Sequence, residues 1–357
     1  MLFQDLLYVE DVKNISELDL PWEKFKGRNI LISGATGLVG CFLIDVIMEK
    51  NISSGLNCKI FALGRDKNKA QERFGSYKDN LLFSFIAHDI NKPLVLDDYC
   101  DIDYVIHMAS NTHPLLYAND PIGTISTNII GLMNLLEFAV EHNTTCFAFT
   151  SSNEIYGENR GDVELFEEDY CGYIDCNTLR AGYPESKRCG EALCQAYKTQ
   201  KGLKVVIPRV TRTYGPTMQM NDSKAISQFI KNSLNKEPIV LKSNGTQYYS
   251  YMYVADAVSG LLYILLKGKN GEAYNISDVT SDITLRELAN LIANISGTEV
   301  TYKEAELVEL SGFSKATKAR LNGNKLRELG WLPKYNIEDG IKRTISILSK
   351  LDDTNIC

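Results

Sequence analysis

Tyr183 and Lys187 stand four residues apart in the stretch 182–188, whose sequence is GYPESKR. In a helix this spacing places both side chains on one face, one turn from each other. An ammonium group beside a phenol stabilises the phenolate, so a tyrosine with an ordinary pKa of about 10 can act as a base nearer neutral pH. The same spacing also arises by chance on a solvated helix face, so its meaning depends on the rest of the chain.

A glycine-rich turn lies between a predicted strand and a predicted helix near the start of the chain. Residues 28–33 form a short apolar run typical of a strand buried on both faces, and residues 34–40 read GATGLVG. Gly34 permits the tight turn, Gly37 lets backbone N–H groups approach a pyrophosphate, and Gly40 lets the helix pack against the strand. The spacing differs from the Gly-x-Gly-x-x-Gly of simple dehydrogenases, and a turn without a ligand is the alternative. We predict a dinucleotide site here, with Thr36, Leu38 and Val39 among its contacts.

The residue that follows the second predicted strand, 59–63, decides which dinucleotide is expected. An acidic residue there would accept hydrogen bonds from the ribose 2′-hydroxyl and favour NAD. The chain instead has Gly64 and then Arg65, whose guanidinium can pair with a 2′-phosphate. We therefore predict a preference for NADP. NAD is the alternative, because Asp66 would become the acid after a shift of one residue.

Three further predicted strands, 82–87, 104–108 and 145–150, end in small or polar residues. Asp89 follows the first of them and is predicted to accept a hydrogen bond from the adenine amino group, with a helix N-cap as the equal alternative. Ligands of doubly wound sheets bind in the crevice outside the carboxyl ends of the strands. The cofactor-binding candidates at these ends are Ile90, Met108, Ala109 and Ser110, with Asn128 on a helix predicted at 121–140, and Lys187.

The stretch 151–157, SSNEIYG, follows the last of these strands and would face a substrate. The Ser152 hydroxyl can hold a substrate oxygen while Tyr183 exchanges a proton with it. Glu154 is a candidate acid or base, and an ordinary surface carboxylate is the alternative.

The order of these elements predicts an α/β fold with a doubly wound, Rossmann-type parallel sheet over residues 27–206. Residues 1–26 are interpreted as an N-terminal extension with one helical turn at 14–18. Residues 207–357 are interpreted as a smaller mixed domain that mainly binds substrate and returns segments to the sheet. With 357 residues, of which 44% are hydrophobic, the chain is long enough for this arrangement.

Charge and cysteine usage exclude several classes of protein. The net charge is −7 and no basic run is present, which argues against a nucleic-acid partner. The first residues lack the pattern of a signal peptide and no apolar run approaches about 18 residues, so we predict a cytoplasmic protein without a membrane partner. Nine cysteines without Cys-x-x-Cys pairs indicate neither a disulfide framework nor a metal site. Three of them are predicted to be small core residues: Cys41, Cys146 and Cys194.

The glycine turn, SSNEIYG and YPESK, in this order, resemble the extended short-chain dehydrogenase/reductase family of nucleotide-sugar epimerases, dehydratases and decarboxylases. The resemblance covers roughly residues 27–350 and is nearest to UDP-glucuronate decarboxylases and dTDP-glucose 4,6-dehydratases. It implies an NAD(P)-dependent enzyme that acts on a nucleotide-activated sugar and forms a keto-sugar intermediate by hydride transfer at the 4-position. Further stretches that carry the resemblance are HMAS at 107–110, YGP at 214–216, MND at 220–222 and YVAD at 253–256.

The resemblance also implies roles for single residues. Tyr183 would be the acid or base, Lys187 would lower its pKa and bind the nicotinamide ribose, and Ser152 would hydrogen-bond the reacting oxygen. Glu154 matches the glutamate that dehydratases and decarboxylases use beside the reacting carbon. Relatives dimerise through the helices that correspond to 124–142 and 184–198, so a homodimer is expected. The apolar face expected to permit it consists of Leu132, Leu135, Leu136 and Ala139.

Three positions depart from the family pattern and bear on the product. Asn153 replaces the aspartic acid of dehydratases, and an amide cannot deliver a proton as a carboxylic acid can. Tyr249 replaces an arginine that relatives use on the diphosphate or on a glucuronate carboxylate, which weakens the decarboxylase interpretation. Arg212 replaces an asparagine and is predicted to supply the missing phosphate contact. These three residues are the predicted substrate contacts.

The sequence therefore predicts an epimerase or dehydratase type of enzyme that returns the hydride to the same sugar. The Gly64-Arg65 pair supports an alternative, an NADPH-dependent reductase of a nucleotide-activated keto-sugar. An alternative of another class is a non-catalytic protein that senses the cofactor. The intact Tyr183, Lys187 and Ser152 argue against it, because a sensor needs no proton donor.

Overall fold

The computed structural model describes residues 2–96, 101–112, 114–306 and 316–353, and its largest element is a parallel sheet. The strand order is β11-β7-β5-β4-β1-β2-β3, with the short strand β6 beside β7. This order confirms the predicted doubly wound, Rossmann-type sheet. The strands are β1 Asn29–Ser33, β2 Lys59–Gly64, β3 Phe83–Ala87, β4 Tyr104–His107, β5 Cys146–Phe149, β6 Ser151–Ser152, β7 Val205–Val210 and β11 Ala273–Ile276.

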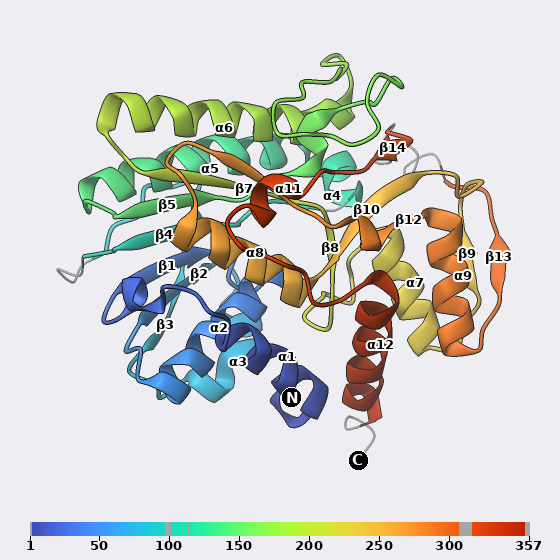
Figure 1. Ribbon diagram of the computed structural model, residues 1–357, viewed down its shortest axis with the longest axis horizontal. Helices are drawn as coiled ribbons and strands as arrows, with labels where there is room; N and C mark the ends of the chain where they lie inside the picture. Colours follow the sequence, from blue (N-terminus) through green and yellow to red (C-terminus); the bar gives the residue numbers. More distant parts are fainter. Residues whose placement is uncertain (1, 97–100, 113, 307–315, 354–357) are drawn as a thin grey trace.

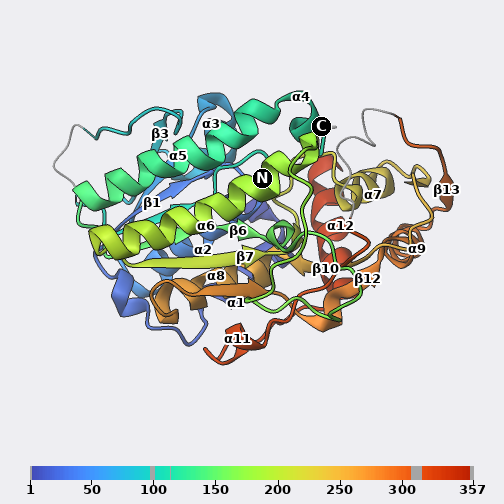
Figure 2. The ribbon, with the colours of Figure 1, turned by 90° about the horizontal axis from the view of Figure 1, so that it is seen from above.

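Helices cover both faces of this sheet (Figures 1 and 2). α5 (Pro121–Glu141) and α6 (Gly182–Lys201) lie side by side on one face, whereas α2 (Leu38–Ser54) and α8 (Val254–Lys267) lie on the other. Because both faces are covered, the central strands are apolar without alternation, and β1 is buried from Ile30 to its end. The shorter helices α3 (Lys67–Phe74) and α4 (Pro114–Asn119) follow β2 and β4.

A smaller mixed unit lies at one end of the large sheet, on the right of Figure 1. Its central strand is β10 (Tyr248–Tyr253), which pairs in parallel with β8 (Arg212–Tyr214) and β14 (Lys318–Ala319) and antiparallel with β12 (Asp282–Thr284). Thr284 and Glu287 form a capping box at the start of the helix that follows β12. The remaining elements are α7 Ala225–Leu234, α9 Leu285–Ser296, α11 Asn324–Arg327, α12 Ile337–Asp353, and the strand pair β9 Ile239–Leu241 and β13 Val300–Tyr302.

The N-terminal segment is packed into the fold. The single helical turn predicted at 14–18 is wrong, because α1 spans Leu6–Ser16. Tyr8 of α1 donates a hydrogen bond to the buried Asp45 of α2. Asp11 of α1 is also fully buried, and it accepts hydrogen bonds from tyrosines of β10 and of the segment before α12. The segment interpreted as an extension thus joins α2 of the large sheet's helical layer to the smaller unit.

The apolar residues of α5 predicted as a dimer face point inward, so that prediction is wrong for these side chains. Leu132, Leu135, Leu136 and Ala139 are all 0% exposed because the sheet covers them. In the described part of the chain, α5 is the single helix long and apolar enough to cross a membrane by length and composition alone, a test that core helices also pass. The sequence had given no run of that length. The large apolar residues that α5 does expose are Ile122, Ile125, Ile130 and Met133.

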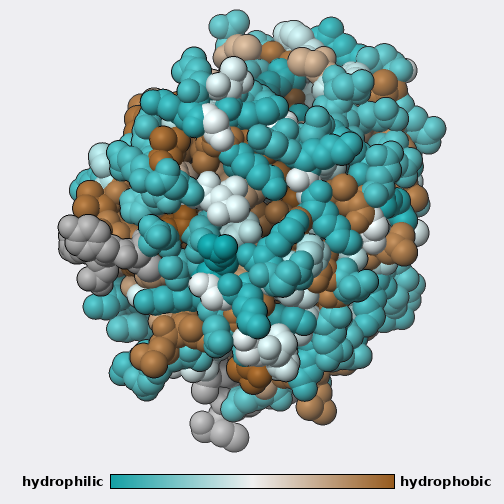
Figure 3. Space-filling model, turned by 60° about the vertical axis from the view of Figure 1, so that its left-hand side comes forward, coloured by the Kyte–Doolittle hydropathy of each residue, from teal (hydrophilic) through white to brown (hydrophobic). Residues whose placement is uncertain are grey.

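The surface is mainly hydrophilic on the face shown in Figure 3, where apolar residues form small separate groups. The predicted core cysteines Cys41, Cys146 and Cys194 are confirmed as buried. The seven cysteines within the described ranges are free thiols, and Cys100 and Cys357 lie outside those ranges.

Candidate active site

The turn between β1 and α2 fits a dinucleotide because its backbone comes close to the neighbouring strand. Gly34 has a φ of +72°, and a Cβ atom there would lie 2.7 Å from the backbone nitrogen of Ala109. At Gly40 a Cβ atom would lie 2.5 Å from the carbonyl oxygen of Gly34, so α2 packs directly on the turn. α2 begins at Leu38 after Gly37, which has no side chain to cap the helix. The first N–H groups of α2 therefore point to where a phosphate would bind.

A cavity of about 1140 Å³ opens beside this turn and continues to the smaller unit. This volume exceeds the range of about 300–1,000 Å³ typical of a pocket for one small ligand, so there is room for a dinucleotide and a second ligand. Every predicted site residue except Asn128 lies in its lining: Gly34, Thr36, Gly37, Leu38, Val39, Gly40, Arg65, Asp89, Ile90, Met108, Ala109, Ser110, Ser152, Asn153, Glu154, Tyr183, Lys187, Arg212 and Tyr249.

Tyr183 and Lys187 lie on the first turns of α6 and are 7% and 3% exposed. Burial raises the pKa of Tyr183 to about 12, the Glu154 carboxylate raises it further, and a hydrogen bond with Ser152 lowers it. Burial lowers the pKa of Lys187 to about 8. The amine of Lys187 donates to the carbonyl oxygen of Thr150 at 2.9 Å. In the free protein the phenol therefore carries its proton at neutral pH, and Tyr183, Ser152 and Lys187 meet at one wall of the cavity.

Asn128 lies behind the cavity lining and is fully buried. Its side chain accepts a hydrogen bond from the Ser110 hydroxyl at 2.7 Å and donates to the Ser186 hydroxyl at 2.9 Å. Ser186 in turn donates to the backbone carbonyl of Tyr183 at 2.9 Å. Asn128 is thus a positioning residue, because it joins the end of β4 to the first turn of α6.

Glu154 forms an ion pair with Arg180, a residue that the sequence had not singled out. Arg180 lies three residues before Tyr183, within the short 3₁₀ turn Leu179–Ala181 that leads into α6. Burial disfavours the charged guanidinium, but the Glu154 carboxylate offsets this and the pKa of Arg180 is raised. Its position three residues before Tyr183 is the one signal in the sequence that could have found it. Tyr117 of α4, which shares the same wall, carried no such signal.

Arg212 and Tyr249 come from the neighbouring strands β8 and β10. The guanidinium of Arg212 lies 3.5 Å from the centre of the Tyr249 ring, and the Tyr249 hydroxyl donates to the carbonyl oxygen of Ala316 at 2.7 Å. The Nη1 atom of Arg212 is buried and has no hydrogen-bond partner among the described residues, so a ligand oxygen would satisfy it. A side pocket of about 70 Å³ adjoins Arg212, and its polar lining includes Asn153, Glu154, Glu158, Asp175 and Arg180.

Asp66 and Asp89, the two acidic residues considered in the sequence as contacts of the adenosine, each stabilise a local turn. Asp66 caps α3 by accepting a hydrogen bond from the backbone N–H of Lys69 at 3.0 Å. Asp89 accepts from the backbone N–H of Asn91 at 3.1 Å, in a turn that no helix follows, so the helix N-cap alternative is wrong. Arg65 is exposed at the rim. In both Asp66 and Asp89 this backbone hydrogen bond uses one carboxylate oxygen, and the second oxygen takes no part in it.

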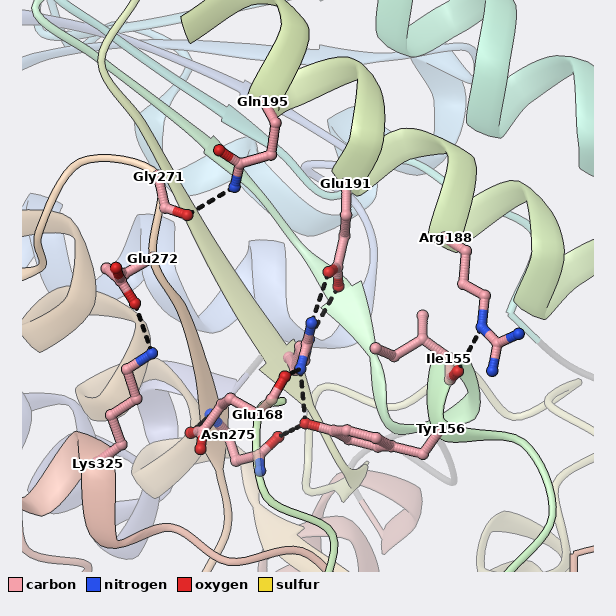
Figure 4. A network of polar contacts seen from close by, with 11 residues as sticks. Ile155, Tyr156, Glu168, Arg188, Glu191, Gln195, Gly271, Glu272, Asn275 and Lys325 are labelled. Carbon is pink, nitrogen blue, oxygen red and sulfur yellow. Dashed lines mark hydrogen bonds and ion pairs between the residues drawn. The ribbon is translucent and has the colours of Figure 1, made fainter. Parts of the chain in front are cut away.

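A polar network holds the segment 151–157 against α6, β7 and β11 (Figure 4). Arg209 of β7 forms a two-pronged ion pair with Glu191 of α6, at 2.9 and 2.7 Å. Arg209 also donates to the Tyr156 hydroxyl at 2.8 Å, and Tyr156 donates to Asn275 of β11 at 2.6 Å. The network fixes the polar residues after β5 relative to α6, the helix that bears Tyr183 and Lys187.

The chain matches a known family over most of its length. The model of the NAD dependent epimerase/dehydratase family matches residues 30–277, which include the glycine turn, Tyr183, Lys187 and the last strand of the large sheet. The chain belongs to this family. It is therefore an NAD-dependent enzyme of the nucleotide-sugar epimerase, dehydratase and decarboxylase group. The sequence predicted this group, with NADP as the preferred cofactor and NAD as the alternative.

Individual relatives agree with this assignment. UDP-glucuronic acid decarboxylase 5 of Arabidopsis thaliana is 31% identical over 323 residues, which cover 87% of this chain and 86% of the relative. The UDP-glucuronic acid 4-epimerase of Bacillus cereus, solved with UDP-glucuronic acid and NAD, has a TM-score of 0.76 at 22% identity and covers 90% of this chain and 99% of its own. The dTDP-glucose 4,6-dehydratase of Bacillus anthracis, solved with NAD, has a TM-score of 0.76 at 22% identity, with coverages of 91% and 98%. These two structures share the fold of this family member.

Proposed function

We propose that this enzyme epimerises a nucleotide-activated sugar. In this reaction a hydride leaves the sugar at position 4 and returns to the same molecule. The observation that carries the proposal is that Ser152, Tyr183 and Lys187 share one cavity with the glycine turn. Bound NAD would supply the acceptor and the donor of the hydride. The glycine turn and Lys187 would hold that cofactor, and the chain itself supplies the proton chemistry.

The proton chemistry rests on Tyr183 and Ser152. When a sugar hydroxyl becomes a ketone, its oxygen loses a proton, and Tyr183 takes this proton and returns it when the ketone is reduced. Ser152 orients the same oxygen through its hydroxyl. Because the pKa of Tyr183 is about 12 in the free protein, oxidation of the sugar should become faster as the pH rises toward that value.

Epimerisation is favoured over the two related reactions by the residues near the reacting centre. Dehydration needs a group that protonates a leaving hydroxyl, and the amide of Asn153 cannot supply that proton. Decarboxylation needs a sugar that bears a carboxylate, and the arginine that relatives use on that carboxylate is Tyr249 here. The side pocket holds Glu158 and Asp175 besides the paired Glu154 and Arg180, so Arg212 is the one cation of its lining that forms no ion pair with a carboxylate of the described residues.

Product analysis of the purified protein with NAD tests the proposal. We would supply UDP-glucose, dTDP-glucose and UDP-glucuronate and expect an epimer of unchanged mass, with no net change in the absorbance of reduced nicotinamide. A product lighter by carbon dioxide would identify a decarboxylase, and one lighter by water a dehydratase. Binding of the cofactor without turnover of any sugar would indicate a sensing protein.

The variant Tyr183→Phe tests the assigned chemistry directly. Turnover should fall by about 10³-fold while the affinity for NAD changes by less than about twofold, because only the phenolic hydroxyl is lost. An active variant would overturn the mechanism.

The finer choice of cofactor is proposed on the basis of Arg65. A preference for NADP is supported by Arg65 and Lys69 in the cavity lining and by the use of Asp66 as a helix cap. The same residues favour the second candidate function, an NADPH-dependent reductase of a nucleotide-activated keto-sugar. Stoichiometric consumption of NADPH, added in place of NAD together with a nucleotide-activated keto-sugar, would identify that reductase.

A further inference from the structure

Tyr117 is a buried tyrosine of the reaction wall that has no part in the chemistry described so far. It lies on α4, between the end of β4 and the start of α5, and is 5% exposed. Its side chain lines the large cavity together with Tyr183 and Arg180. A tyrosine so placed is either packing material or part of the acid–base unit.

The Tyr117 ring contacts both Tyr183 and Arg180. The ring centres of Tyr117 and Tyr183 are 4.8 Å apart, and the two planes are inclined by 29°. The Arg180 guanidinium carbon lies 4.6 Å from the centre of the Tyr117 ring. Arg180 is also paired with Glu154. Tyr117 therefore contacts both the ion pair and the proposed acid–base tyrosine.

The two phenols differ in which of them can release a proton. Burial raises the pKa of Tyr117 well above its ordinary value, and Tyr183 and Glu154 raise it further. The pKa of Tyr183 is raised less, to about 12, because Ser152, Arg180 and a hydrogen bond with Tyr117 oppose burial and Glu154. Tyr117 thus stays protonated and remains a donor when Tyr183 ionises. The charged groups that face the two rings are Glu154, Arg180 and Asp222, with Lys187 one turn along α6.

We propose that Tyr117 is a positioning residue for Tyr183: its ring, which contacts both Arg180 and Tyr183, fixes the angle of the Tyr183 phenol, and its hydroxyl stabilises the Tyr183 phenolate. The proposal deepens the epimerase assignment and rests on Tyr183 exchanging the proton. The ring supplies orientation, which controls the rate once substrate is bound. The hydroxyl supplies a hydrogen bond to the charged form, which controls when Tyr183 ionises.

Two substitutions separate these contributions in the full-length protein with bound NAD. Tyr117→Phe keeps the stacked ring and removes the hydroxyl, whereas Tyr117→Leu removes both. The ionisation of Tyr183 would be followed by fluorine NMR after labelling with difluorotyrosine, whose more acidic phenol titrates in an accessible pH range. The Tyr183 signal is assigned by its loss in Tyr183→Phe.

We expect the Tyr183 transition to move to higher pH by about half a unit or more in Tyr117→Phe and at least as far in Tyr117→Leu, because the phenolate loses a donor. The kcat of Tyr117→Leu should fall by roughly tenfold, with the phenylalanine variant restoring part of it and KM for the nucleotide sugar nearly unchanged. Tyr274→Phe, a change at a buried tyrosine of β11 outside the cavity lining, is the matched control and should alter neither quantity.

A Tyr183 transition that stays in place in both variants would overturn the proposal, and so would a leucine variant with the kcat of the unmodified protein. If the leucine variant fails to fold, the transition in Tyr117→Phe decides alone. If no nucleotide sugar is turned over, that result counts against the epimerase assignment, while the NMR titration still decides the role of Tyr117.

Discussion

The two walls of the cavity are built on different principles. The cofactor wall is formed by backbone atoms. Gly34, Gly37 and Gly40 leave these atoms uncovered, and a Cβ atom added at any of them would come too close to neighbouring backbone. The reaction wall is made of side chains from elements far apart in the sequence, such as Tyr117 on α4 and Arg212 on β8. The first wall is a local motif, whereas the second exists only after α4, α6, β8 and β10 have packed together.

This difference bears on which wall tolerates substitution. At the glycine turn an added Cβ atom would come too close to neighbouring backbone atoms, so a larger residue is not accommodated there without a shift. In a wall formed by side chains, a charged residue can stand on either of two neighbouring strands and still reach the same part of the cavity. Here the cation is Arg212 of β8, and the residue at the family's arginine position is Tyr249 of β10, whose ring lies 3.5 Å from that guanidinium.

The largest effect is expected where the backbone wall is filled. In Gly34→Ala the new Cβ atom would lie 2.7 Å from the backbone nitrogen of Ala109, and the strand end must shift. We expect a loss of about 3 kcal/mol in the free energy of unfolding and at least roughly a hundredfold weaker binding of NAD. Urea denaturation and calorimetry measure the two quantities.

Gly202→Ala is the matched control for this prediction. Its φ of +71° nearly equals the +72° of Gly34, but a Cβ atom there meets nothing within 4 Å. The control should lose only about 1 kcal/mol, the cost of a left-handed alanine, and keep its affinity for NAD. Equal losses of stability and of NAD affinity in the two variants would contradict the prediction, because the close approach of Gly34 to Ala109 would then have no effect.

A smaller effect is expected at the side-chain wall. Arg212→Ala removes the guanidinium whose buried Nη1 atom would bind a phosphate oxygen. We expect affinity for UDP, UDP-glucose and UDP-glucuronate to weaken alike, by about tenfold, because all three carry the diphosphate. Calorimetry measures this, with Arg160→Ala as control, since Arg160 also stacks on a tyrosine but lies outside the cavity lining. Weakening confined to UDP-glucuronate would instead assign Arg212 to the sugar carboxylate and support a decarboxylase.

The same contrast explains what could be predicted from the sequence. Strand, turn and helix follow one another around Gly34, so the spacing of neighbouring residues in the sequence is enough to predict their geometry. Tyr117 could not be found in this way, because its partner Tyr183 is distant in the chain and the contact forms only when α4 reaches α6. Asn128 was predicted to bind the cofactor, but its side chain bonds to Ser110 and Ser186 instead. The sequence cannot distinguish the two roles, because an asparagine suits either of them. The dimer face on α5 was wrong because an apolar stripe does not say which surface covers it.

A stability measurement sharpens the contrast further. Burial lowers the pKa of Lys187 from 10.5 to about 8, which costs about 3 kcal/mol while the amine is charged. Lys187→Met removes this cost and also the hydrogen bond to Thr150, so the variant should be more stable by about 1–2 kcal/mol at pH 7. The unfolded chain binds the proton more tightly than the folded one, so the gain is complete below about pH 8 and shrinks as the pH rises toward 10.5.

Thermal unfolding of the variant from pH 6 to pH 10 checks this prediction. Lys201→Met, at an exposed lysine at the end of the same helix, should change the free energy of unfolding by less than about 0.5 kcal/mol at any pH. A gain for Lys187→Met that does not vary with pH would show that packing, rather than the buried charge, limits stability at the reaction wall.

The smallest effect is expected at the rim of the cofactor wall, where a side chain replaces backbone as the selective element. Arg65 is exposed, so its attraction to a 2′-phosphate is screened, and Arg65→Ala should weaken NADP relative to NAD by about fivefold at low salt and by less at high salt. Lys67→Ala, at an exposed residue outside the cavity lining, is the control. The solved relatives hold NAD, so the NADP proposal depends on this chain's own residues, Arg65 above all. If the unmodified protein binds NAD more tightly and Arg65→Ala leaves the ratio unchanged, the free carboxylate oxygen of Asp66 becomes the group that selects the cofactor.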